Sequence, residues 1–224
     1  MPNIRLSDAE KNQIADAVAE AEKKTSGEIV TAVISQSYDY ALYELIYAIV
    51  CGFVYFVVVM FFSGNIQTWL ENTFWDYNIQ YLLAFYGFTT FLIIAVFYFL
   101  FNLPFLDRLI IPQRVKAGKV KERALRYFME SGVYNTRDRT GILIFISLLE
   151  KKVELVADSG IDARIEPGQW QQVVDNVIAG IKGDNFAGSL IEAVNACGNI
   201  LQRHFPIRSD DSNELKNDLT ILEE

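Results

Sequence analysis

Two long apolar runs dominate the hydrophobic pattern of this chain. Residues 43–62 are apolar apart from Glu44, and residues 81–106 contain no charged side chain. About twenty helical residues rise about 30 Å, the thickness of the hydrocarbon core of a bilayer. A core helix of a soluble protein normally keeps a polar stripe, and neither run has one. The pattern therefore predicts a transmembrane hairpin over residues 38–110, with helices at about 43–62 and 81–106.

The remaining apolar positions form shorter segments separated by polar turns. Continuous β-branched runs predict buried strands, and apolar positions at helical spacing predict helices. Ser7 and Glu10 form a capping box at the first helix. The expected strands cover 28–35, 142–148 and 153–157, and the expected helices cover about 8–24, 113–131 and 186–204, with a further helix that starts near residue 167.

The order of these elements predicts the fold class. It is helix, strand, hairpin, helix, two strands and two helices, which favours an α/β domain of three layers, α/β/α, with a small mixed sheet. The two-helix transmembrane hairpin interrupts this domain. We expect residues 1–37 to form its first part, residues 111–206 its second part, and residues 207–224 an acidic mobile tail.

The distribution of basic residues predicts the orientation in the membrane. The connector, residues 63–80, contains no Lys or Arg, whereas Lys23 and Lys24 precede the hairpin and seven basic residues follow it between Arg108 and Arg126. The positive-inside rule then places both flanks in the cytoplasm. We expect a multi-pass protein of the plasma membrane, which is the inner membrane in a bacterium, with both termini cytoplasmic.

The charge of the chain also limits which classes of partner we expect. The formal net charge is −8, which argues against nucleic acid. The basic residues after the hairpin are expected to contact anionic lipid headgroups. Ala48 and Gly52 form a small-xxx-small pair that would let two helices approach closely, so a homo-oligomer through the transmembrane helices is also open.

Three stretches resemble a known family. They are LSDAEKNQIADAVAEAEKKTSGEIVTAVI from Leu6 to Ile34, RTGILIFISLLEKKVELVADSGID from Arg139 to Asp162, and the region from Trp170 to Phe205. Their order and spacing resemble the TPM domain family. The sequence departs from the family at two turns: Thr140-Gly141 replaces the usual Asn-Gly, and Ser159-Gly160-Ile161 replaces the usual Gly-Tyr-Gly. The resemblance implies several possible roles, because family members include acid phosphatases, calcium-binding domains, and assembly or repair factors.

Four carboxylates at the ends of the expected strands are candidate metal ligands. Carboxylate and carbonyl oxygens are the ligands that calcium and magnesium prefer, and a bound cation could orient a phosphate. Acidic residues at turns also cap helices or bond to the local backbone, so a purely structural role stays open. The candidates are Glu28, Asp138, Asp158 and Asp162.

No catalytic set is evident in the sequence. His204 is the single histidine, so a zinc site or a nucleophile with a histidine base is disfavoured. Cys51 and Cys197 are not expected to form a disulfide. The favoured hypothesis is a membrane-anchored cytoplasmic domain that binds, assembles or repairs a membrane-protein partner. The alternative is a divalent-metal-dependent acid phosphatase.

Overall fold

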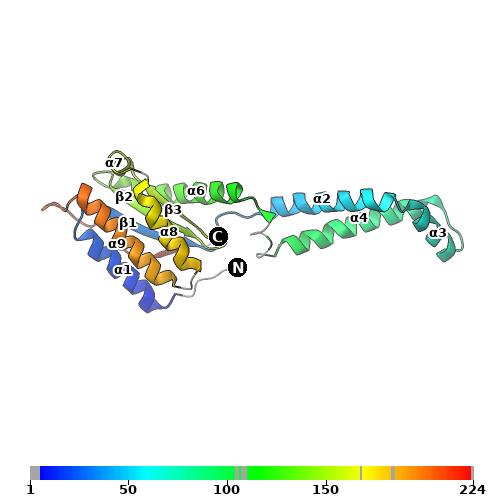
Figure 1. Ribbon diagram of the computed structural model, residues 1–224, viewed down its shortest axis with the longest axis horizontal. Helices are drawn as coiled ribbons and strands as arrows, with labels where there is room; N and C mark the ends of the chain where they lie inside the picture. The colour runs from blue at the N-terminus through cyan, green and yellow to red at the C-terminus, as the bar shows by residue number, and fades with distance from the viewer. Residues whose placement is uncertain (1–5, 104–105, 107–109, 167, 183–184, 223–224) are drawn as a thin grey trace. The chain divides into compact units, whose positions relative to one another are not determined.

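A computed structural model describes residues 6–103, 106, 110–166, 168–182 and 185–222 (Figure 1). The chain divides into two compact units. One unit comprises residues 1–38 and 113–224, and the other comprises residues 39–112. Arg108, which the sequence analysis placed in the basic flank, lies outside the described residues, as does residue 167 near the expected start of a helix.

A mixed four-stranded sheet forms the centre of the first unit, as the sequence predicted. Its strand order is β3-β2-β1-β4. β1 runs parallel to both β2 and β4, whereas β2 and β3 are antiparallel. β1 and β2 are buried along their whole length, because helices cover both of their faces. The strands are β1 Glu28–Ile34, β2 Gly141–Ser147, β3 Lys152–Ala157 and β4 Thr220–Leu222.

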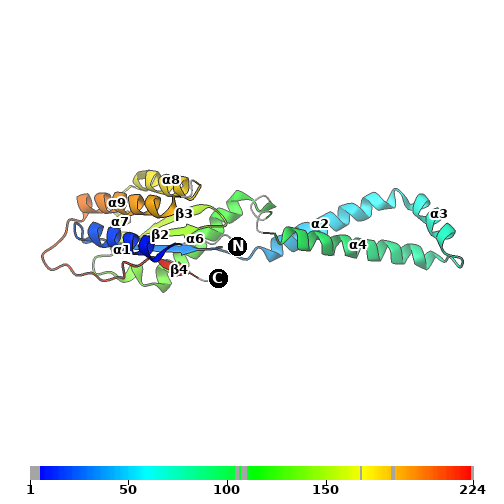
Figure 2. The ribbon, with the colours of Figure 1, turned by 90° about the horizontal axis from the view of Figure 1, so that it is seen from below.

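Three helices cover one face of the sheet (Figure 2). They are α1 Asp8–Glu22, α8 Gly168–Lys182 and α9 Phe186–His204. Ser7 caps α1, and the expected capping box with Glu10 is present. Alternate strand residues such as Ile29 and Ile144 point to this face and pack with Val194 of α9.

The other face carries helix α6, Gln113–Glu130, and the short 3-10 helix η1, Val133–Asn135. Here Val30 and Phe145 pack with Ala124 of α6. Alternation of side chains along each strand thus produces two cores, one on each side of the sheet. The prediction of an α/β domain with three layers is confirmed.

The C-terminal segment differs from the sequence-based prediction of a mobile tail. Its strand β4 pairs with β1 between Ala32 and Ile34. Leu219 is buried in the core on the α1 side, and Leu215 and Leu222 pack against the core on the α6 side. The segment therefore closes the edge of β1 and contacts both hydrophobic cores, which an acidic composition alone did not suggest.

The second unit is a helical hairpin. α2, α3 and α4 cover Ala41–Met60, Ser63–Thr73 and Ile79–Phe101. α2 and α4 are each long and apolar enough to span a membrane. α2 and α4 pack along their length, with Gly52 directly against Ile94. The small pair Ala48 and Gly52 is thus buried inside the hairpin, while homo-oligomerisation stays a prediction.

Candidate functional site

At one end of the strands, the start of β1, the start of β2 and the end of β3 lie side by side. The backbone N–H of Glu28 donates to the carbonyl of Thr140 at 3.1 Å. The backbone N–H of Asp158 donates to the carbonyl of Gly141 at 2.9 Å. Because β3 runs antiparallel to β2, Asp158 at the end of β3 lies at the same end of the sheet as Glu28 at the start of β1. This is the amino end of the parallel strands, not the carboxyl end where ligands of α/β sheets usually bind.

Gly141 separates these two carboxylates. Glu28 pairs with Gly141 in the register of β1 and β2, and Asp158 flanks Gly141 from β3. Glu28 and Asp158 are therefore two strand spacings apart, about 10 Å. A Cβ added at Gly141 would collide with the carbonyl oxygen of Val133. Backbone of η1 thus occupies the space above Gly141, between the two acidic residues.

Two of the three aspartates have structural contacts, and the third is exposed. Asp158 caps the short helix α7, Ser159–Asp162, by accepting from the N–H of Ser159 at 2.6 Å. Asp158 also lies 3.8 Å from Arg139. Asp138 forms an ion pair with Arg208, and Asp162 is exposed. These contacts fit the capping and turn roles that acidic residues often have.

The proposed metal ligands do not gather into one cluster. Among the residues that the structure describes, no group of three or more His, Cys, Asp or Glu side chains is placed to hold a metal ion. Glu28 and Asp158 share one edge of the sheet, and Asp138 lies in the turn just before β2. Binding of calcium or magnesium by these four residues stays a prediction.

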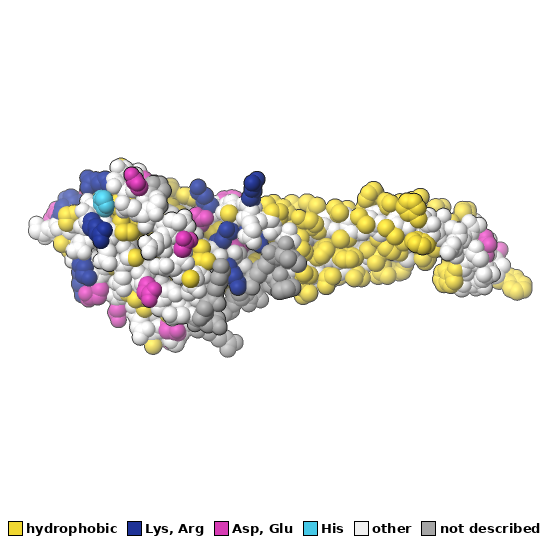
Figure 3. All heavy atoms as spheres, viewed as in Figure 1, with side chains coloured by type: hydrophobic (Ala, Val, Ile, Leu, Met, Phe, Trp, Pro, Cys, Tyr) yellow, Lys and Arg dark blue, Asp and Glu magenta, His cyan; other side chains and the backbone are white. Residues whose placement is uncertain are grey.

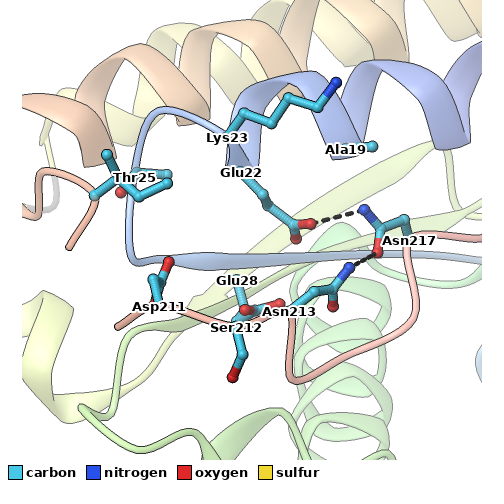
Figure 4. Close-up of a pocket in the computed structure, with 10 residues that line it drawn as sticks. Ala19, Glu22, Lys23, Thr25, Glu28, Asp211, Ser212, Asn213 and Asn217 are labelled. Carbon is cyan, nitrogen blue, oxygen red and sulfur yellow. Dashed lines mark hydrogen bonds between the residues drawn. The ribbon is translucent and has the colours of Figure 1, made fainter. Parts of the chain in front are cut away.

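A separate acidic pocket involves Glu28 and was not expected from the sequence (Figure 4). Its volume is about 290 Å³. The end of α1 and the start of β1 form one wall, and the C-terminal segment forms the other. The polar residues that line it are Glu22, Lys23, Thr25, Glu28, Asp211, Ser212, Asn213 and Asn217.

Glu22 joins the two walls of this pocket. Its Oε1 accepts from the backbone N–H of Ile29 at 2.9 Å, and its Oε2 accepts from the side-chain amide of Asn217 at 2.7 Å. Burial raises the pKa of Glu22 to about 8, and the negative charges of Glu28 and Asp211 act in the same direction. The two hydrogen bonds oppose this shift only in part.

Glu28 has a similar environment. Its side chain is 5% exposed, and its Oε1 accepts from the backbone N–H of Glu214 at 3.2 Å. Burial raises the pKa of Glu28 above its usual range, and hydrogen bonds from the backbone counter this. The pocket therefore holds two carboxyl groups that favour protonation or a compensating cation. It contains neither a histidine nor a cysteine.

Sequence reasoning identified Glu28 but missed Glu22, Asp211 and Asn217. Glu22 lies in the last turn of an amphipathic helix, where an acidic residue normally faces water. One partner of Glu22, Asn217, follows it by 195 residues, in the segment that the pairing of β4 with β1 holds beside the sheet. The run Leu219-Thr220-Ile221-Leu222 is mostly apolar, but it is too short to show the period of a strand.

Comparison with known proteins supports the fold. The NMR structure of the BA42 protein from the psychrophilic bacterium Bizionia argentinensis sp. nov. aligns with a TM-score of 0.59. Sequence identity is 19%, and the alignment covers 99% of each chain. At this identity the likeness concerns the fold alone. A search of curated proteins found no match.

One family model matches part of the chain. The model of the TPM domain matches residues 108–200, from the end of the hairpin through most of α9. The matched segment contains α6, β2, β3 and α8 in the order expected from the sequence, with the short helix α7 where a turn was expected. Residues 108–200 are therefore similar to the TPM domain, as the resemblance of the sequence led us to expect.

Proposed function

We propose that this protein is a membrane-anchored TPM domain that binds a membrane-protein partner from the cytoplasmic side. The observation that carries the proposal is the surface of the α2–α4 hairpin. Hydrophobic side chains cover it (Figure 3), and Phe53, Phe91 and Phe99 are 65%, 72% and 73% exposed. Soluble monomers rarely expose a continuous apolar surface of this extent, whereas lipid would cover it without cost.

The connector fits the outer interface of a membrane. Trp69 and Trp75 are both exposed within or just after α3. Tryptophan is enriched where headgroups meet the hydrocarbon core. The connector lacks basic residues, whereas α6 carries several, including Arg114, Lys119 and Arg126. This asymmetry supports a cytoplasmic TPM domain through the positive-inside rule.

A binding role agrees with the chemistry of the domain. The pocket at Glu22 and Glu28 has buried carboxyl groups but no nucleophile with an adjacent histidine base. A domain held at the membrane by two helices is also confined to the plane in which its partner would lie. Confinement to one membrane raises the effective concentration of the two proteins. The domain and its partner can therefore bind each other even if their affinity in solution is modest.

Affinity capture tests this proposal. The full chain would be tagged at its C-terminus, crosslinked in native membranes with reagents of different length, and extracted in mild detergent. We expect a specific membrane protein to co-purify. The matched control exchanges the TPM residues 113–222 for an unrelated soluble domain on the same hairpin, and it should lose the partner. Recovery of the protein alone with every crosslinker would contradict the proposal.

The alternative of a metal-dependent phosphatase has one observation in its favour. Glu28 and Asp158 reach the same edge of the sheet despite lying on different strands. If a cation binds there, calcium or magnesium should raise the melting temperature of the purified protein. Hydrolysis of phosphomonoesters should then disappear in Asp158→Asn and Glu28→Gln. A melting temperature that neither cation changes would remove this alternative.

A further inference from the structure

β3 is an edge strand with a free backbone edge. Among the described strands it pairs with β2 alone. The backbone N–H of Asp158 donates to the carbonyl of Gly141, so Asp158 directs its backbone groups towards β2. Along an antiparallel strand, successive residues direct their backbone groups alternately towards and away from the partner strand. The N–H and C=O groups of Val153, Leu155 and Ala157 therefore point away from β2. Three residues thus present donors and acceptors at the edge.

This edge lies in a groove rather than on a convex surface. The groove has a volume of about 530 Å³, and all six residues of β3 line it. Lys121 and Leu125 of α6 form one side, and Val174 and Ile178 of α8 belong to the other. The space therefore follows the whole strand and has helical walls on both sides.

The groove has apolar side chains on the α8 side, the charged Lys121 and Glu154 on the α6 side, and opposite charges at its two ends. Leu155 and Ala157 pack towards the α8 side, where Trp170 is also found. Lys152 lies at the start of β3, and Asp162 follows the end of the strand. An extended segment with apolar residues at alternate positions would match the walls. An acidic residue near Lys152 and a basic residue near Asp162 would match the ends.

We propose that the groove along β3 binds an extended segment of a partner protein by β-strand addition. Backbone hydrogen bonds to Val153, Leu155 and Ala157 would supply the recognition of an extended chain, and the groove walls would select its side chains. Natural proteins usually block a free edge with a proline, a bulge, charged side chains or a covering element. β3 contains no proline, its charged residues Lys152 and Glu154 lie in its first half, and β4 closes the opposite edge of the sheet instead.

A single extended segment fits this groove better than a second copy of the chain. In a second copy, α6 and α8 also flank β3. Pairing of two such edges would bring the helices of both copies together beside the strands, whereas a lone strand brings no helices with it. This inference rests on the proposed binding function, for which it specifies the surface and the form of the partner.

Fluorescence polarisation with defined peptides tests the inference on the full chain in detergent. Two labelled peptides of about eight residues would alternate Val and Thr, enough to span the six-residue strand. One peptide would carry Glu at its amino end and Lys at its carboxyl end, and the other would have these ends exchanged. We expect saturable binding of at least one peptide. Absence of saturable binding by either peptide would overturn the inference.

Two variants at one position separate the backbone from the side chain. Leu155→Pro removes an outward N–H and leaves the ladder to β2 in place, a position where an edge strand tolerates proline. Leu155→Ala also removes the leucine side chain but keeps the backbone N–H. We expect peptide affinity to be at least about tenfold weaker in Leu155→Pro than in Leu155→Ala, as for loss of about one hydrogen bond. Equal affinities would refute strand addition.

The same two variants distinguish this inference from the proposed function. In the crosslinking experiment on native membranes, Leu155→Ala should retain the membrane partner and Leu155→Pro should lose most of it. A partner retained equally by both variants would refute the groove as its docking surface and leave the binding function intact. A partner absent from the unsubstituted chain as well would refute the binding function itself.

Discussion

The carboxylate of Glu28 accepts a hydrogen bond of 3.2 Å from the backbone N–H of Glu214, 186 residues later in the chain. This contact links the first residue of β1 to the C-terminal segment. Arg137 adds a second link, because its side chain lies 2.9 Å from Asp210. The last part of the chain is therefore an integral part of the α/β domain and forms one wall of its acidic pocket.

Glu22 should make the stability of the domain depend on pH. Its pKa is about 8 in the folded protein, against an ordinary value of 4.5. Between these values the folded state binds a proton that the unfolded state has lost, so the contribution of Glu22 to stability falls as pH rises. Glu22→Gln removes this titration. The difference in melting temperature, variant minus parent, should increase by about 10 °C between about pH 5 and about pH 9.

The control for Glu22 is Asp16→Asn on the same helix. Asp16 is exposed, so its substitution should change the melting temperature little. Differential scanning fluorimetry of the full chain in detergent measures all three proteins under one set of conditions. A temperature difference for Glu22→Gln that is constant across the range would contradict the burial of this carboxyl group.

Substitution by alanine should affect stability differently at Leu219 and at Ile221. Leu219 is 8% exposed and belongs to the core, whereas Ile221 is 49% exposed in the adjacent strand β4. Leu219→Ala should lower the free energy of unfolding by about 2–3 kcal/mol. Ile221→Ala should change it by less than about 0.5 kcal/mol.

Urea denaturation followed by tryptophan fluorescence measures this difference. The chain has three tryptophans, and Trp170 is the one in the TPM domain. Trp69→Phe and Trp75→Phe therefore leave a single reporter of that domain. Equal midpoints for the two alanine variants would show that the C-terminal segment does not pack as described.

Gly52 should be essential for close packing of the hairpin. A Cβ at this position would collide with the side chain of Ile94 in α4. Gly87 in α4 has nothing within 4 Å of the corresponding position, so Gly87→Leu is a matched control. Gly52→Leu should increase amide hydrogen exchange in both α2 and α4 in detergent micelles, because the helices must separate. Similar exchange in the two variants would rule out this contact.

Most of the fold could be predicted from local sequence patterns. The periodicity that predicts a helix over 186–204 corresponds to α9, Phe186–His204, and the β-branched runs correspond to β1 and β2 within one residue at each end. These elements are buried on defined faces, so their apolar positions repeat with a readable period. The long apolar runs likewise correspond to α2 and α4, although each helix begins two residues earlier than expected.

The parts that could not be predicted depend on contacts between distant residues. Strand β4 has three residues, too few for a periodic signal, and it is held by β1 and by Leu219 in the core. The environment of Glu22 depends in turn on Asn217. Glu28, Asp138 and Asp158 were expected from their positions at strand ends. Sequence could not show that backbone at Val133 fills the space above Gly141.

Alkaline carbonate extraction tests most directly whether α2 and α4 lie in a lipid bilayer. Membranes from cells that express the full chain would be washed in carbonate at about pH 11 and separated from the supernatant, which releases proteins held by charge but not those inserted by apolar helices. We predict that the full chain stays in the membrane pellet together with a known integral protein. Release of the chain into the supernatant would contradict membrane insertion, and with it the proposed role as a membrane-anchored TPM domain.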